Sequence, residues 1–259
     1  MCMQYLDLSD RADRLFFCGD IHGEYSSLVY NLTKQQIRNA IVVVAGDCGL
    51  GFDEWKAYDL KFNILHDELE QLNTIILLVR GNHDDPRWFR EKLIDYTYVR
   101  ALPDYTVVGT NGHQVLCVGG AVSLDRQFRI SSMKYYEDLG KNVSKIYWED
   151  EPMCFDEETL KMLDVQGIKI DTIVTHAAPS FYPLPFDKDY EHYCANDNSL
   201  DDEVRSERER ISRLYDYLIS HHHPVRNWFF GHYHKSGHYL YNETKLRMLD
   251  IKEIVSIDE

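Results

Sequence analysis

One construction recurs along this chain: a short apolar run ends abruptly, and a carboxylate, amide or imidazole follows it. In residues 15–23, Leu-Phe-Phe-Cys-Gly-Asp-Ile-His-Gly, the run is followed by Asp20 and His22, with Gly19 and Gly23 on either side. Glycine tolerates backbone angles that other residues do not, so both side chains can stand at the tip of a buried strand. The pattern recurs four more times, and the residues that follow the other runs are Asp47, Asn82, His83, His176, His232 and His234.

The spacing of the first runs predicts an α/β fold. Residues 40–45 and 74–79 are continuous aliphatic runs, typical of strands buried on both faces. Residues 25–36 and 54–70 have helical character, and Asp85 with Pro86 caps a short helix that continues to Leu93. Alternating strands and helices imply a mainly parallel sheet, whose ligands bind outside the carboxyl ends of the strands. The polar residues after the runs all lie at such ends.

The rest of the chain is more varied. Asn111-Gly112 predicts a tight hairpin, and residues 123–152 read as a long, aromatic loop insertion of the kind that often covers a site. Residues 187–199 read as an acidic, tyrosine-rich loop, and residues 201–222 as a charged amphipathic helix. Further strands are expected at 170–175, at 227–230 and within 239–257. Without a repeat or a linker, we expect a single domain over residues 1–259.

Composition narrows the class of protein. A formal net charge of −15 and a pI near 5.2 argue against long nucleic acid as a partner, because gripping phosphates needs a basic face. The six cysteines are scattered without a C-x-x-C pair, and no apolar run approaches the ~20 residues of a membrane span. We therefore expect a reduced, cytoplasmic protein that does not enter a membrane. The oligomeric state is left open.

The polar motifs form an ordered set: Gly-Asp-Ile-His-Gly, Gly-Asp-Cys-Gly, Gly-Asn-His-Asp, Thr-His-Ala-Ala-Pro and Gly-His-Tyr-His. In this order they resemble the calcineurin-like metallophosphoesterase superfamily, over essentially the whole chain. The resemblance implies two packed mixed β-sheets flanked by helices, an αββα sandwich, with a two-metal site. Residues 119–126 and 148–151 are similar to a bacterial or phage-type phosphohydrolase group.

The resemblance also implies a ligand set. The first metal would be held by Asp20, His22 and His234, the second by Asn82, His176 and His232, and both by Asp47. Such oxygen and imidazole ligands suit manganese, which we favour, with iron, zinc, nickel or magnesium as alternatives. Two ions bring +4 and the two aspartates remove 2, so with a bridging hydroxide the centre keeps a charge of about +1 and attracts phosphate.

Four further residues have expected roles near the substrate. In the family the position of His83 faces the substrate as an acid or transition-state donor, and Asp84 orients it. Arg126 and Arg129 are candidate substrate contacts, since arginine forks onto phosphate. The alternative is that these arginines pair with Asp138 or Glu149 while the aromatic residues pack the loop, and we leave both readings open.

The function expected is a binuclear metal-dependent phosphohydrolase, in which a metal-bridging hydroxide attacks a small phosphoester or a nucleotide. Related phosphatase groups follow the bridging aspartate with Asp-Arg-Gly, but here Cys48-Gly49-Leu50-Gly51 follows it, so that phosphate-clamping arginine is missing. A phosphodiesterase acting on nucleotides or nucleic acid is the alternative. A non-catalytic, protein-binding scaffold of the same fold is a third reading, disfavoured because all seven ligands and His83 are present.

Overall fold

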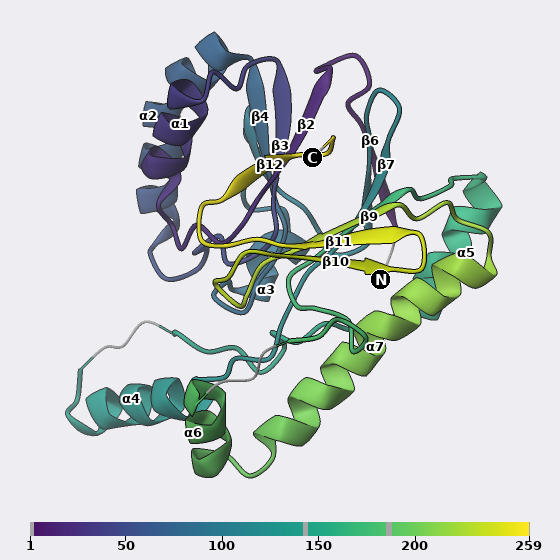
Figure 1. Ribbon diagram of the computed structural model, residues 1–259. Helices are drawn as coiled ribbons and strands as arrows, with labels where there is room; N and C mark the ends of the chain where they lie inside the picture. Colours follow the sequence, from purple (N-terminus) through teal and green to yellow (C-terminus); the bar gives the residue numbers. More distant parts are fainter. Residues whose placement is uncertain (1–2, 142–144, 185–187, 259) are drawn as a thin grey trace.

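The computed structural model of the chain describes residues 3–141, 145–184 and 188–258. Within those ranges the strands form a seven-stranded and a five-stranded sheet, both mixed, which pack on each other and are flanked by helices. This arrangement is visible in Figure 1 and confirms the expected α/β architecture of two packed mixed sheets.

The five-stranded sheet carries the first three polar motifs. Its order is β12-β2-β3-β4-β5, and β12 alone among these strands runs antiparallel to its neighbour. Helices α1 and α2 connect its parallel strands, as the sequence predicts. The elements are β2 (Arg14–Cys18), α1 (Tyr25–Lys34), β3 (Ala40–Val44), α2 (Trp55–Leu72), β4 (Thr74–Leu78), α3 (Pro86–Arg90), β5 (Val99–Ala101) and β12 (Ile254–Ser256).

The seven-stranded sheet carries the last two motifs. Its order is β1-β6-β7-β8-β9-β11-β10, with β7, β8 and β9 parallel in the centre and antiparallel pairs at β6–β7 and β10–β11. The elements are β1 (Gln4–Asp7), β6 (Thr106–Gly109), β7 (Gln114–Val118), α5 (Glu157–Gln166), β8 (Thr172–Thr175), α7 (Leu200–Ser220), β9 (Asn227–Phe230), β10 (Gly237–Tyr241) and β11 (Thr244–Met248).

The alternation of side chains along each strand explains the layers. Ile41 and Val43 of β3 point into the core between the sheets, whereas Val42 and Val44 pack under α1 and α2. Across the sheet interface, Phe17 stacks on Phe229 with ring centroids 3.7 Å apart. Both faces of the central strands are therefore covered, which is why their sequences are continuously apolar.

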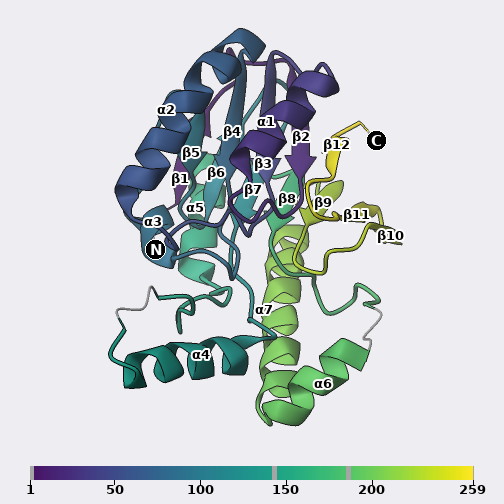
Figure 2. The same ribbon diagram turned by 90° about the vertical axis from the view of Figure 1, so that its left-hand side faces the viewer.

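Two segments expected as loops contain helices. Within residues 123–152, helix α4 spans Arg126–Asp138; within 187–199, helix α6 spans Lys188–Asn196, while residues 142–144 and 187 lie outside the described residues. The buried side chains of α4 are two arginines, so no apolar stripe signals this helix in the sequence. In both views α4 and α6 lie below the two sheets, near the N-terminal end of α7 (Figures 1 and 2).

Across the described ranges, no helix combines the length and the apolar character that a membrane span requires.

Candidate metal centre

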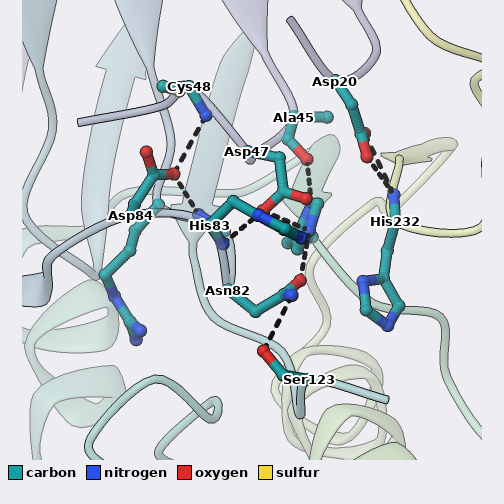
Figure 3. A network of polar contacts seen from close by, with 12 residues as sticks. Asp20, Ala45, Asp47, Cys48, Asn82, His83, Asp84, Ser123 and His232 are labelled. Atoms are coloured by element: carbon teal, nitrogen blue, oxygen red, sulfur yellow. Dashed lines mark hydrogen bonds and ion pairs between the residues drawn. The ribbon is translucent and has the colours of Figure 1, made fainter. Parts of the chain in front are cut away.

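The polar residues after the strands come together at one edge of the two-sheet core (Figure 3). The parallel strands of both sheets end there, so residues far apart in sequence become neighbours. The residues and the strands that they follow are Asp20 and His22 after β2, Asp47 after β3, Asn82 and His83 after β4, His176 after β8, and His232 and His234 after β9.

The backbone is strained where these side chains are presented. His22, Asp47, His232 and His234 all have positive φ angles, of 45°, 49°, 71° and 49°. A left-handed backbone is unfavourable for residues other than glycine and persists only where the surroundings impose it. Such strain concentrates at functional sites, and here it falls on four of the seven candidate ligands.

Two motif glycines serve close packing. A Cβ atom on Gly81 would collide with Oδ1 of Asp47, and one on Gly231 would collide with Oδ1 of Asp20. The glycines before Asn82 and His232 therefore leave room for the carboxylates of neighbouring strands. Glycine at these positions thus has a second role, close packing, beside the sharp turn that the sequence predicts.

One group of candidate ligands is compact. Asp20, His22, Asp47 and His234 each offer a nitrogen or oxygen atom, and these atoms lie within 4.8 Å of one another. Nε2 of His234 is 3.1 Å from Nε2 of His22 and 3.1 Å from Oδ2 of Asp20. Asp20 is held in place because its carboxylate also accepts the backbone N–H of His232, 3.0 Å from Oδ1.

A second group lies on the other side of Asp47. Nε2 of His176 is 3.1 Å from Oδ1 of Asp47 and 3.1 Å from Oδ1 of Asn82. Nδ1 of His176 lies 2.7 Å from the carbonyl oxygen of Ala45, to which it donates. The His176 ring is thereby fixed with Nε2 directed at two oxygen acceptors, both of which are buried.

The arrangement fits a bound cation. Since Nδ1 of His176 already carries a proton for Ala45, a second proton on Nε2 or a metal ion must lie between this nitrogen and its two acceptors. Although burial opposes it, the Asp47 carboxylate raises the pKa of His176 to about 10, and His176 in turn holds the pKa of Asp47 well below its usual range, also against burial. In the other group, a hydrogen bond to Asp20 raises the pKa of His234. Divalent ions would replace these protons.

The orientation of the Asn82 amide is fixed by a hydrogen bond to Ser123. Its Nδ2 donates to the hydroxyl of Ser123 at 3.0 Å, so its Oδ1 faces His176. The Ser123 hydroxyl donates in turn to the buried Glu151 at 2.9 Å, and the Ser123 N–H donates to the same carboxylate at 2.7 Å. Neither Ser123 nor Glu151 was predicted to have a role from the sequence alone, where the available signal was that Ser123 follows strand β7 at the same sheet edge.

Among the seven candidate ligands, His232 differs from the other histidines, because within the described ranges its ring contacts other rings and not a carboxylate. Its ring is 5.0 Å from that of His176, centroid to centroid, and burial holds its pKa well below the usual range. A neutral imidazole is the form that binds a metal. Figure 3 shows its ring directed away from Asp20, and it lines the same cavity as Asp47 and Asn82.

His83 lies at the mouth of the centre and contacts an arginine. Its backbone N–H donates to Oδ1 of Asp47 at 2.7 Å, and its Nε2 accepts from Nη2 of Arg129. Burial, together with the positive charge of Arg129, lowers the pKa of His83 to about 4 although Asp47 opposes this. His83 is therefore neutral at physiological pH, and its own proton is on Nδ1.

The expectation that Asp84 orients the His83 ring is not matched by its contacts. The Asp84 carboxylate is fully buried and accepts the backbone N–H groups of Gly81 at 2.7 Å, Leu50 at 2.8 Å and Cys48 at 3.0 Å. Burial raises its pKa to about 7, helped by Asp47 and opposed by these three hydrogen bonds. Asp84 thus ties the loop after Asp47 to the loop that carries Asn82.

The two candidate substrate arginines have different surroundings. Arg126 is buried and pairs with Asp197 and Glu203, whereas the alternative reading of the sequence named Asp138 or Glu149 as partners. Arg129 is also buried, but besides its ion pair with Asp125 at 2.8 Å it reaches His83 and the carbonyl of Asn82. Of the two, Arg129 is the one in contact with the candidate centre.

Single substitutions should distinguish the structural role of Arg126 from the role of Arg129 near the candidate centre. Arg126→Ala leaves two carboxylates without their partner and should cost about 3 kcal/mol of unfolding free energy, because a broken buried ion pair is expensive. Arg129→Ala also removes an ion pair, with Asp125, but it should in addition lower kcat/KM for phosphoester hydrolysis, since it frees the His83 ring. Denaturant unfolding and steady-state kinetics of both variants test this. Equal kinetic losses with equal stability would contradict it.

The fold and the site together define a class, that of two-sheet α/β proteins with a cluster of aspartate and histidine at the strand ends that could bind a metal ion. The model of the calcineurin-like phosphoesterase family matches residues 14–236, and the chain belongs to this family. Family membership and the cluster of Asp20, His22, Asp47 and His234 indicate a metal-dependent phosphoesterase. No curated protein sequence matches the chain.

Several solved structures have a similar course of the backbone. The phosphopantetheinyl hydrolase of Mycobacterium tuberculosis is 12% identical, with a TM-score of 0.38 over 93% of this chain and 90% of that one. A cold-active protein-tyrosine phosphatase of a Shewanella species is 14% identical, with a TM-score of 0.37 over 98% and 77%. A protein serine/threonine phosphatase of Saccharomyces cerevisiae is 17% identical, with a TM-score of 0.35 over 96% and 70%. These TM-scores are too low to bear on function.

Proposed function

We propose that this protein is a binuclear metal-dependent phosphohydrolase that acts on small phosphoesters. The observation that carries the proposal is the position of Asp47 between two sets of ligands. Its Oδ1 is 3.1 Å from Nε2 of His176, and its Oδ2 is 3.9 Å from Nδ1 of His22. One carboxylate can therefore face two cations.

The ligand assignment follows these two sides. One ion would be held by Asp20, His22 and His234, the other by Asn82, His176 and His232, and Asp47 would bind both. Oxygen and imidazole donors without thiolate favour manganese or another divalent ion of similar preference. When bound, two such ions polarise a phosphoryl group and lower the pKa of a water molecule that attacks it in line.

The protein's own residues supply the rest. Asp47 is held by the backbone N–H of His83, and Asn82 is held by Ser123, so both ligands are preorganised. His83 lines the cavity in front of the ligands and is a candidate to donate a hydrogen bond to the phosphoryl group or to the leaving oxygen. Its Nδ1 proton serves this role while Arg129 occupies Nε2.

The size and charge of the substrate follow from the surroundings. With a net charge of −15, the chain is poorly suited to long nucleic acid, and the attraction for phosphate must come from the metal ions and from local cations such as Arg129. A small phosphoester, including a nucleotide, fits this balance. The proposed setting is the cytoplasm.

Metal analysis and hydrolysis of two generic esters test the proposal. The purified protein, loaded with manganese and freed of excess ion, should hold two ions per chain and hydrolyse p-nitrophenyl phosphate. Activity should vanish on chelation and return with added manganese. If bis(p-nitrophenyl) phosphate is the better substrate, the diesterase reading replaces the monoesterase one. A protein that binds two ions but cleaves neither ester would instead support the scaffold reading.

A further inference from the structure

A cavity of about 400 Å³ opens onto the candidate metal centre. One side of it is formed by the centre itself, through Asp47, Asn82, His83, His232 and His234. This volume lies within the range of about 300–1,000 Å³ found for pockets that enclose whole small molecules. The cavity therefore holds more than a phosphoryl group, and its remaining walls face the group to which the phosphate is attached.

The remaining walls are mainly apolar and aromatic. Tyr190 and Tyr193 come from α6, Val204 from α7 and Leu124 from the segment before α4. The same four residues belong to a small apolar cluster built around Val122, Leu200 and Val204. The cavity is thus bounded by a packed apolar surface with two half-buried tyrosines, which extends beyond the candidate ligands.

The acidic side chains in these walls already have partners. The buried carboxylate of Glu207 accepts the backbone N–H groups of Val122 at 2.9 Å and Met153 at 3.0 Å. Asp125 pairs with Arg129 at 2.8 Å. These groups hold the walls together, so they are poorly placed to recognise the hydroxyl groups of a sugar or polyol. Lys235 also lines the cavity and adds a positive charge next to His234 in sequence.

Because one end of the cavity is formed by the candidate metal centre and the rest by apolar and aromatic side chains, we infer that the cavity is a leaving-group pocket. Its preferred substrates would be phosphate esters of alcohols carrying an apolar ring. The inference rests on the proposed function and specifies its substrate class. The charged end would take the phosphoryl group, while the ring would lie against Tyr190, Tyr193 and Val204. Aromatic rings pack well on one another in offset or edge-on geometry, and burying apolar surface favours binding.

A matched pair of esters tests this class. The esters 3-phenylpropyl phosphate and 3-hydroxypropyl phosphate have similar leaving oxygens and differ in the terminal group. The manganese-loaded protein should show kcat/KM about 10–100-fold higher for the phenyl ester, the range expected for filling an apolar pocket. Calorimetry with the non-hydrolysable 3-phenylpropylphosphonate and 3-hydroxypropylphosphonate should show the same order of affinity.

Tyr193→Ala should reduce the ratio between the two esters and weaken binding of the phenyl phosphonate by about 10-fold. Tyr135→Ala is the matched control, because Tyr135 lies on α4, is 61% exposed and does not line the cavity. Competition of inorganic phosphate with the phenyl phosphonate shows whether the phosphate-binding end of the cavity is still formed in each variant. Equal kcat/KM for the two esters, or equal effects of the two substitutions, would overturn the inference.

The binding measurement separates this inference from the proposed function. If metal-loaded protein hydrolyses no ester, the proposed hydrolase activity fails, yet a preference for the phenyl phosphonate that Tyr193→Ala removes still supports the pocket. If esters are hydrolysed but neither rates nor binding distinguish the ring, the activity stands and the pocket assignment is wrong.

Discussion

Asp47→Asn is expected to lose at least one of two bound metal ions and to lower turnover by roughly 10³-fold or more, while the fold survives. The substituted amide keeps the shape and can still accept the His83 N–H from Oδ1. It lacks the negative charge that two cations would share, and it offers Nδ2 in place of one oxygen. Metal content by mass spectrometry and kcat for p-nitrophenyl phosphate measure the two effects.

Asp104→Asn provides the control for Asp47→Asn. Asp104 is a partly buried carboxylate away from the candidate ligands, where it pairs with Arg80 at 2.9 Å and accepts the Gly119 N–H. Its substitution should lower thermal stability and leave metal content unchanged. An Asp47→Asn protein that retains two ions and full activity would refute the shared-ligand role, and with it the two-metal assignment.

His83→Ala is expected to keep both metal ions and to lower turnover by roughly 10²–10⁴-fold, the usual range for a removed proton donor. Its ring contacts Arg129, and the link to Asp47 runs through the His83 backbone N–H, which alanine retains. The loss should be smallest for esters with good leaving groups, whose leaving oxygen needs little stabilisation by a hydrogen bond. Metal analysis alongside kinetics distinguishes this role from that of a ligand, for which metal content and activity would fall together.

The pH dependence adds a second test of His83. Because burial and Arg129 lower its pKa to about 4, the ring is neutral above that pH. If the neutral ring is the donor, kcat corrected for metal content should not rise as the pH falls from 7 to 5. If the imidazolium were required, its population and therefore kcat would increase about tenfold per pH unit over this range. A rise of that size that disappears in His83→Ala would show that the charged form acts.

The family, the sheet architecture and the positions of the polar motifs could be inferred from sequence because they are set by local patterns. A continuously aliphatic run such as residues 40–44 is compatible with a strand covered on both faces, and that strand becomes the centre of the five-stranded sheet. The polar residue after such a run then falls at the carboxyl edge. Asp47 and Asn82 are neighbours in space for this reason.

Helix α4 could not be inferred from the sequence because it lacks a periodic apolar stripe. On α4 the buried residues are Arg126 and Arg129, and Arg126 is stable there because Asp197 and Glu203, two acidic residues from other segments, pair with it. No local pattern specifies such partners. Which residues of α6 and α7 line the cavity also depends on contacts between distant segments, so the sequence alone does not indicate them.

The sequence by itself determined which side chains stand at the strand ends, because strand burial and turn chemistry are local properties. The tertiary structure alone decided what those side chains touch. It turned Asp84 toward three backbone N–H groups, placed Arg129 on His83, and oriented Asn82 through Ser123 and Glu151. Except for the contact between Asp84 and Gly81, these contacts join residues tens of positions apart, and their geometry depends on how the two sheets and their connecting segments pack.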